Sequence, residues 1–79
     1  MKELVQYITE YIVSKPEEIR IDEVQVSDKE ILLELHVAEE DLGRIIGKKG
    51  KIAKNIRNVL RAVSLRKGIE YNLKIMESK

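Results

Sequence analysis

Two glycines three residues apart, Gly47 and Gly50, interrupt the longest run of helical periodicity in this 79-residue chain. Apolar residues recur at helical spacing on both sides of the pair. Glycine has no Cβ and adopts backbone angles that are closed to other residues, so the chain can turn sharply here. The sequence therefore predicts a short helix that Gly47 ends, a turn, and a longer helix over residues 51–66.

The rest of the chain predicts one more helix and three strands. They are a helix over residues 2–14, strands over residues 19–26 and 31–37, and a last strand over residues 71–75. Pro16 disfavours helical geometry before it and ends the first helix. The alternation of the first strand changes phase near Asp22 and Glu23, which indicates a bulge or two half-strands. Gly68 is expected to cap the long helix. The order is helix-strand-strand-helix-helix-strand, an α+β fold.

The chain length allows one domain, over residues 1–79, with a modest hydrophobic core. There is no cysteine, which excludes disulfides and thiolate metal sites. The apolar stretches are three residues long at most, and the N-terminus shows helical periodicity with interspersed glutamates. These features predict a soluble, cytoplasmic protein without a signal peptide.

Charge is strongly segregated along the chain, although its net value is only +1. Residues 1–42 hold four Lys/Arg and twelve Asp/Glu, a net charge of −8. Residues 43–68 hold nine Lys/Arg and no acid, a net charge of +9. A solvated helix face usually mixes both signs. A block of one sign on an otherwise acidic chain is instead typical of a site for a polyanion.

The glycine pair and the basic block coincide, and together they predict a clamp for phosphate groups. The unpaired N–H groups of the helix that follows Gly50 point toward a ligand in the turn, an arrangement suited to phosphate. Lysines at the tip and on the next turn add positive charge. The candidate binding residues are Arg44, Ile46, Gly47, Lys48, Lys49, Gly50, Lys51, Lys54 and Arg61. Ile45, Ile46 and Ile52 are candidates for either an apolar groove or the core, and the core is favoured for Ile52.

Gly-x-x-Gly alone is a weak motif, but its context here is specific. Two isoleucines precede it, Ile52 and a basic helix follow it, and strands lie on both sides. Residues 31–76 resemble the core of KH domains, whose GXXG loop clamps about four nucleotides. The helix and strand over residues 2–26 resemble the bacterial type II arrangement, with a three-stranded mixed sheet packed against three helices. The whole chain is similar to the KhpA (YlqC-like) family of stand-alone bacterial KH proteins.

This resemblance implies a protein that binds single-stranded RNA and acts as an RNA chaperone or post-transcriptional regulator in the cytoplasm. It implies that bases lie in a groove between the helices beside the loop and a neighbouring strand. It further implies a homodimer, pairing with a larger KhpB (Jag-type) protein that has its own KH domain, and a link to cell shape and cell wall biogenesis. No cofactor is expected.

Two other functions stay open at this point. One is a helix-turn-helix DNA binder, which the short first helix and the flanking strands disfavour. The other is a KH fold used mainly for protein association. The sequence shows no activated nucleophile and no convincing catalytic carboxylate pair, so an enzyme is not expected. His36, without a second His or any Cys, is predicted to be an ordinary surface residue with no metal. The three tyrosines are predicted to be packing residues, and the absence of Phe and Trp argues against RNA modules that stack bases on aromatic platforms.

Overall fold

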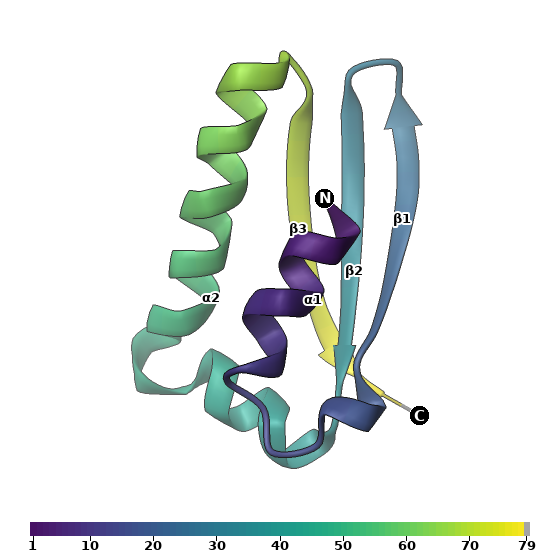
Figure 1. The fold of residues 1–79 in the computed structure, drawn as a ribbon. Helices are drawn as coiled ribbons and strands as arrows, with labels where there is room; N and C mark the ends of the chain where they lie inside the picture. The colour runs from purple at the N-terminus through teal and green to yellow at the C-terminus, as the bar shows by residue number, and fades with distance from the viewer. Residues whose placement is uncertain (79) are drawn as a thin grey trace.

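The computed structural model describes residues 1–78, including every side chain except those of Lys48 and Lys49. The elements in chain order are α1 (Lys2–Glu10), a 3-10 turn η1 (Pro16–Glu18), β1 (Arg20–Ser27), β2 (Glu30–Val37), α2 (Glu39–Lys67) and β3 (Glu70–Glu77). Figure 1 shows the strands side by side, with α1 crossing in front of the sheet and α2 rising along the β3 side. The predicted α+β class is confirmed.

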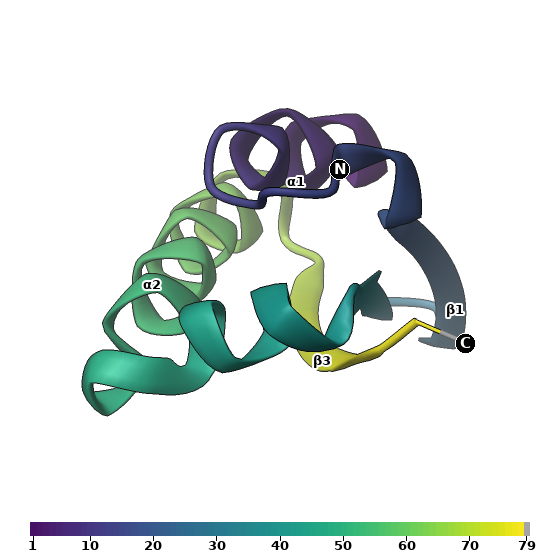
Figure 2. The same cartoon turned by 90° about the horizontal axis from the view of Figure 1, so that it is seen from below.

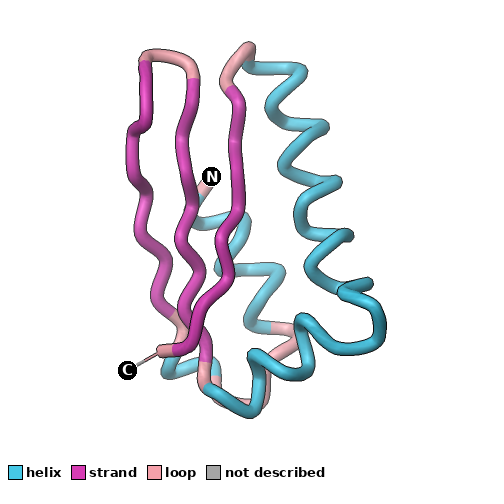
Figure 3. The backbone as a smooth tube through the Cα atoms, turned by 180° about the vertical axis from the view of Figure 1, so that it is seen from behind, coloured by secondary structure: helices cyan, strands magenta, loops and turns pink. Residues whose placement is uncertain are grey.

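The three strands form one mixed sheet in the order β1-β2-β3. β1 and β2 form an antiparallel hairpin, and β2 pairs with β3 in parallel, with Leu33 opposite Leu73. A parallel pair needs a long crossover, which α2 supplies. Figure 3, seen from behind, shows that no helix of residues 1–78 covers the other face of this sheet. The predicted three-stranded mixed sheet is therefore confirmed, and one of its faces is open.

Alternating residues of β2 form the centre of the core. Leu33, Leu35 and Val37 are fully buried. The helices contribute Val5, Ile45, Ala53, Ile56 and Leu60 to the same cluster. Burying a Leu, Ile or Val side chain is worth about 1.5–3 kcal/mol, so this strand supplies much of the stability of a small domain. Residues 34 and 36 of β2 point to the open face instead.

The helix pair predicted around the glycines is a single element, α2, that bends. Its helical backbone continues through Gly47, so the prediction that Gly47 ends a helix is wrong. The left-handed residue is Gly50, with φ of +66°. We call residues 39–49 the first arm and residues 51–67 the second arm. Figure 2 shows the first arm crossing the base of the molecule and the second arm turning away from it. At its other end α2 stops at Gly68, with φ of +69°, as expected for a glycine cap.

Two further predictions are wrong in detail. The first helix ends at Glu10 and not at residue 14, because residues 11–13 form hydrogen bonds of a tight turn that leads to η1. β1 has no bulge near Asp22, since the register is regular from Arg20 to Gln25 and shifts only between Gln25 and Ser27. The phase change in its sequence arises because Val24 lies on the open face, 42% exposed.

The tyrosines also differ from expectation. Tyr7 and Tyr11, predicted to be core or packing residues, are 60% and 78% exposed. Their rings meet edge to face, with centroids 5.2 Å apart. Tyr71 is partly buried and packs against the core. In the part of the chain that is described, no helix has the length and apolar character needed to span a membrane.

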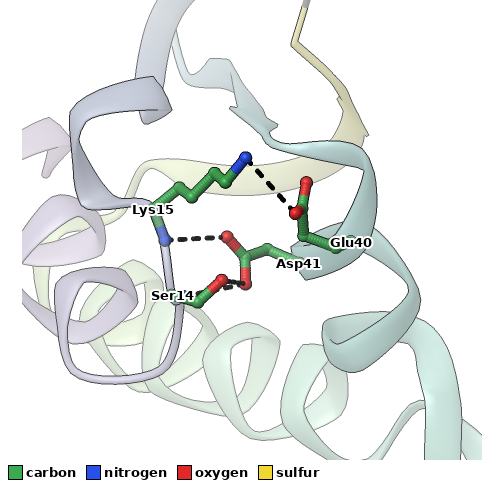
Figure 4. Close-up of polar contacts among 4 residues, drawn as sticks. All are labelled: Ser14, Lys15, Glu40 and Asp41. Atoms are coloured by element: carbon green, nitrogen blue, oxygen red, sulfur yellow. Dashed lines mark hydrogen bonds and ion pairs between the residues drawn. The ribbon is translucent and has the colours of Figure 1, made fainter.

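A buried carboxylate connects the first arm of α2 to the segment that follows α1 (Figure 4). Asp41 Oδ1 accepts hydrogen bonds from the backbone N–H of Ser14 at 2.8 Å and from its hydroxyl at 2.9 Å, and Oδ2 accepts one from the N–H of Lys15 at 3.1 Å. Burial alone would raise the pKa of Asp41, but these donors and the charge of Arg44 outweigh it and hold the pKa below its usual value. Lys15 and Glu40 form an ion pair of 3.3 Å beside it.

Replacing Asp41 with asparagine should destabilise the protein by about 2 kcal/mol, because charge-assisted hydrogen bonds to buried groups contribute about that much. The pKa of Asp41 is lowered by folding, so its contribution is complete above the unfolded value near 3.9 and is lost as pH falls below it. Urea unfolding should be measured for the wild type and for Asp41→Asn at pH 6 and pH 3. The difference between their free energies of unfolding should be smaller at pH 3 than at pH 6. Glu17→Gln, an exposed carboxylate in the same connection, should change stability by less than about 0.5 kcal/mol. A variant as stable as the wild type at pH 6 would contradict this role.

Candidate nucleic-acid interface

The bend of α2 presents bare backbone at both of its glycines. Gly50 needs its left-handed conformation to redirect the chain, and a side chain there would be strained. Gly47 has no such need, because its backbone is helical and a Cβ built on it would meet nothing within 4 Å. Glycine inside a helix costs about 1 kcal/mol relative to alanine. The packing of the described residues therefore gives no reason for a glycine at position 47.

The second arm begins directly after Gly50 and carries basic side chains into solvent. Lys51, Lys54 and Arg57 all have exposed side chains on its first two turns. The predictions for the side chains of Lys48 and Lys49 lie outside the described residues. The loop is therefore flanked on the second arm by at least three cations, in a segment that contains no acid.

Two of the predicted binding residues occupy different surroundings. Arg44 donates from Nη1 to the carbonyl oxygen of Ile12 at 3.3 Å, so it also holds the end of the α1 segment against the first arm. Arg61 lies eleven residues beyond Gly50, about 16 Å along the helix. It lines a cavity with Lys29 and Ser64 near the β1–β2 turn. The structure thus separates Arg61 from the loop.

The structure distinguishes the roles of the three isoleucines around the loop. Ile45 is fully buried and belongs to the core. Ile46, next to Gly47, is 51% exposed and has the most accessible side chain of the three. Ile52 is partly buried, packs against the core and lines an apolar groove with Ile8 and Ile12. The preference for a core role at Ile52 is confirmed.

Arg57 is a basic residue of the second arm that the binding residues predicted from the sequence do not include. Its Nη2 donates to the carbonyl oxygen of Leu73 at 3.3 Å, which places the guanidinium between the second arm and β3. β3 is the edge strand of the sheet on this side. Two features of the sequence pointed to Arg57 as a candidate: it lies in the acid-free block, and it follows Lys54 by three residues, on the same side of a helix. What the sequence could not show is that the second arm packs along β3, and this contact decides where Arg57 lies.

The apolar and polar features meet in one region. The first arm supplies Ile46, the bend supplies bare backbone, and the second arm supplies cations, with Arg57 linking it to β3. β2 precedes α2 in the sequence and β3 follows it, and α2 packs on the sheet that these strands form. This arrangement differs from the pair of helices in a helix-turn-helix domain.

The chain is similar to known proteins over nearly its whole length. Residues 2–75 match the family model "KhpA/KhpB, KH domain". RNA-binding protein KhpA of Chlamydia pneumoniae is 47% identical over 79 residues, which is 100% of both chains. The KhpA protein of Clostridium perfringens is 47% identical over 66 residues, which cover 84% of this chain and 87% of that protein. The KhpA protein of Borreliella burgdorferi is 33% identical over 75 residues, which cover 95% of this chain and 90% of that protein.

A solved structure has the same fold. It is the crystal structure of Era in complex with MgGDPNP and nucleotides 1506–1542 of 16S ribosomal RNA. The match has a TM-score of 0.59 and 25% identity, and it covers 96% of this chain and 29% of that one. The similarity is therefore to one part of a much longer protein.

The helix and strand that precede β2 complete the type II KH arrangement predicted from the sequence. The matched family consists of binding domains without catalytic activity, and the chain is not an enzyme. With a family model that covers residues 2–75 and relatives aligned from end to end, the chain belongs to the KhpA/KhpB family of KH domains.

Proposed function

We propose that this protein binds single-stranded RNA and that the bend of α2 is the site that holds the RNA backbone. The observation that carries the proposal is Gly47, a helical glycine at which an added Cβ would meet no atom within 4 Å among the described residues. A bare backbone is of use there to a ligand that must come closer than a side chain would allow. The relatives named RNA-binding protein KhpA, and the Era structure with ribosomal RNA, support RNA as that ligand.

Phosphate groups are bound by the backbone and by charge together. The first N–H groups of the second arm follow the left-handed turn at Gly50, and N–H groups at the start of a helical segment are suited to phosphate. Lys48, Lys49 and Lys51 provide the positive charge around them, and Lys54 and Arg44 extend it along both arms. Arg61, about 16 Å along the second arm, contacts RNA only if a longer segment follows the helix.

Bases are held between α2 and β3. Ile46 provides an exposed apolar surface at the loop, and Arg57 provides hydrogen-bond donors beside the edge strand. One N–H group of Arg57 donates to the carbonyl oxygen of Leu73, and this hydrogen bond holds the guanidinium in place. Its other N–H groups can donate hydrogen bonds to the edge of a base. Ile46 and Arg57 therefore govern base preference, whereas the loop governs affinity for any sequence.

Charge reversal in the loop, Lys48→Asp with Lys49→Asp, should reduce RNA affinity at least about tenfold. The change of four charges sits where phosphate binds, and about 1.4 kcal/mol is enough for that loss. Thermal unfolding should shift little, since exposed substitutions change stability by about 0.5 kcal/mol. In a titration with labelled single-stranded RNA, the wild type should show a slope of log K against log salt near −3, from about four phosphates, and the variant a shallower one.

The matched control is Lys2→Asp with Lys29→Asp, which makes the same change in net charge away from the loop. It should keep most of the affinity. If both double variants lose affinity equally, net charge and not the loop governs binding. If only the loop variant unfolds, Lys48 and Lys49 have a structural role and the clamp is misplaced. Duplex DNA in the same assay should bind more weakly than single-stranded RNA, and the reverse would favour the helix-turn-helix alternative.

Gly47→Ala should separate stability from binding. Because the backbone is helical and the space open, alanine should raise stability by up to about 1 kcal/mol. The added methyl lies where the RNA backbone approaches, so affinity should fall about tenfold. Chemical unfolding and an RNA titration on the same preparation measure both effects. A variant that is more stable and binds RNA as well as the wild type would show that no ligand approaches Gly47.

We further infer that the protein acts as a homodimer and pairs with a larger KhpB (Jag-type) protein, as an RNA chaperone or post-transcriptional regulator in the cytoplasm. A link to cell shape and cell wall biogenesis belongs to the same proposal. An apolar groove of about 250 Å³ between α1 and the second arm supports pairing, since it is lined by Ile8, Ile12, Ile52, Ile56 and Val59. The same groove is the observation that favours the alternative of a protein-association module.

Sedimentation should detect a dimer at tens of micromolar, since a domain this small gains useful burial by pairing. Val59→Asp places a charge on the groove at a residue that is 39% exposed, so it should weaken the dimer while the monomer stays folded. Arg66→Glu, on an exposed part of the same arm, is the control and should leave the assembly unchanged. A sedimentation coefficient of the 9.2 kDa monomer at all concentrations would contradict the dimer.

A further inference from the structure

Three side chains with metal-binding atoms gather on the open face of the sheet, away from α2. Asp22 comes from β1, and Glu34 and His36 come from β2. One ligand atom from each lies within 4.8 Å of the other two. Asp22 is the direct cross-strand partner of Glu34, and His36 is two residues further along the same face. The hairpin register therefore brings the three together.

His36 is not the ordinary surface histidine that the sequence predicted. Its side chain is only 15% exposed. The Nε2 atom is buried and has no hydrogen-bond partner among the described residues. A buried polar atom without a partner is costly, and native structures contain few of them. The nearest charged atom is Asp22 Oδ2, at 3.4 Å.

The carboxylates beside it face one another across the hairpin, which is unfavourable for like charges. Two cations moderate this repulsion. Arg20 Nη2 lies 3.1 Å from Asp22 Oδ2, and Lys74 of β3 is in register with Glu34. Arg20 is 69% exposed and can swing into solvent, so it does not block the cluster.

We propose that Asp22, Glu34 and His36 bind one late first-row divalent metal ion, of which Zn²⁺ is the reference case. Zinc bonds to nitrogen and oxygen of about 2.0–2.2 Å give a tetrahedral edge near 3.4 Å, the distance that already separates His36 Nε2 from Asp22 Oδ2. Glu34 reaches the third corner by side-chain rotation, and solvent takes the fourth. The imidazole ligand selects against Mg²⁺ and Ca²⁺, which prefer oxygen.

Such an ion would join β1 to β2 and satisfy the buried Nε2 atom. It would stabilise the hairpin by binding only the folded chain. The cluster lies on the face of the sheet that the helices leave open, whereas the RNA site is built from α2 and the edge of β3. The ion should therefore raise thermal stability without strengthening RNA binding.

The test is a titration of tag-free, chelator-treated protein with ZnCl₂ by calorimetry, and a melting curve with zinc at ten times the measured Kd. One ion should bind per chain, and the melting temperature should rise by about 6–11 °C. His36→Gln should weaken zinc binding at least about tenfold, as should Asp22→Asn, since even indirect partners of a metal contribute 10–100-fold. Glu23→Gln, which removes a neighbouring exposed carboxylate of β1, should bind zinc normally.

His36 is the only histidine of the chain, so its imidazole nitrogen resonances report the site without ambiguity. Zinc should shift the Nε2 signal, and Mg²⁺ at the same concentration should not. This measurement needs no variant and holds even if a substitution impairs folding. Absence of saturable zinc binding, zinc binding that His36→Gln leaves intact, or an unshifted Nε2 signal in the zinc-loaded protein would each overturn the proposal.

Discussion

The left-handed backbone at Gly50 is the constraint on which the arrangement of this molecule depends. A helix of 29 residues would be about 44 Å long if straight, longer than the 34 Å extent of the whole molecule. The turn at Gly50 lets both arms of α2 cover the sheet, with Ile45 of the first arm and Ile56 and Leu60 of the second arm in one core. The same turn exposes the backbone between the arms. A single conformational requirement thus shapes the core and creates the proposed binding site.

The first arm must be held firmly for that turn to have a defined direction. Asp41 does this from the start of the helix, through three hydrogen bonds to Ser14 and Lys15. Arg44 adds a contact to the carbonyl oxygen of Ile12 one turn later. The segment between α1 and η1 therefore serves as a brace for the arm that carries Ile46 and Gly47.

The sequence was sufficient for the class of fold and for the position of the loop, because local rules govern both. Alternation defined β2, helical spacing defined the arms, and Gly68 marked the end of α2. It was insufficient wherever tertiary packing decides. Asp41 lies in the first turn of a helix, where acids are common, but its carboxylate accepts hydrogen bonds from Ser14 and Lys15, 27 and 26 residues earlier in the chain. The position of the Arg57 side chain depends on its hydrogen bond to Leu73 of β3. Tyr11 has the helical spacing of a buried residue, but α1 ends at Glu10, before it.

The segregation of charge gives the two faces different chemistry. The +9 segment, residues 43–68, is nearly all of α2, so under the proposed function an RNA strand is attracted to the two arms and the bend. The −8 segment supplies α1, β1 and β2, and its acids on the open sheet face repel phosphate. Repulsion of this kind orients an approaching strand, because binding on the wrong face is disfavoured before any contact forms. The acids that repel RNA also raise the local concentration of cations, and His36 adds the nitrogen ligand that makes Asp22 and Glu34 selective for a late first-row divalent ion.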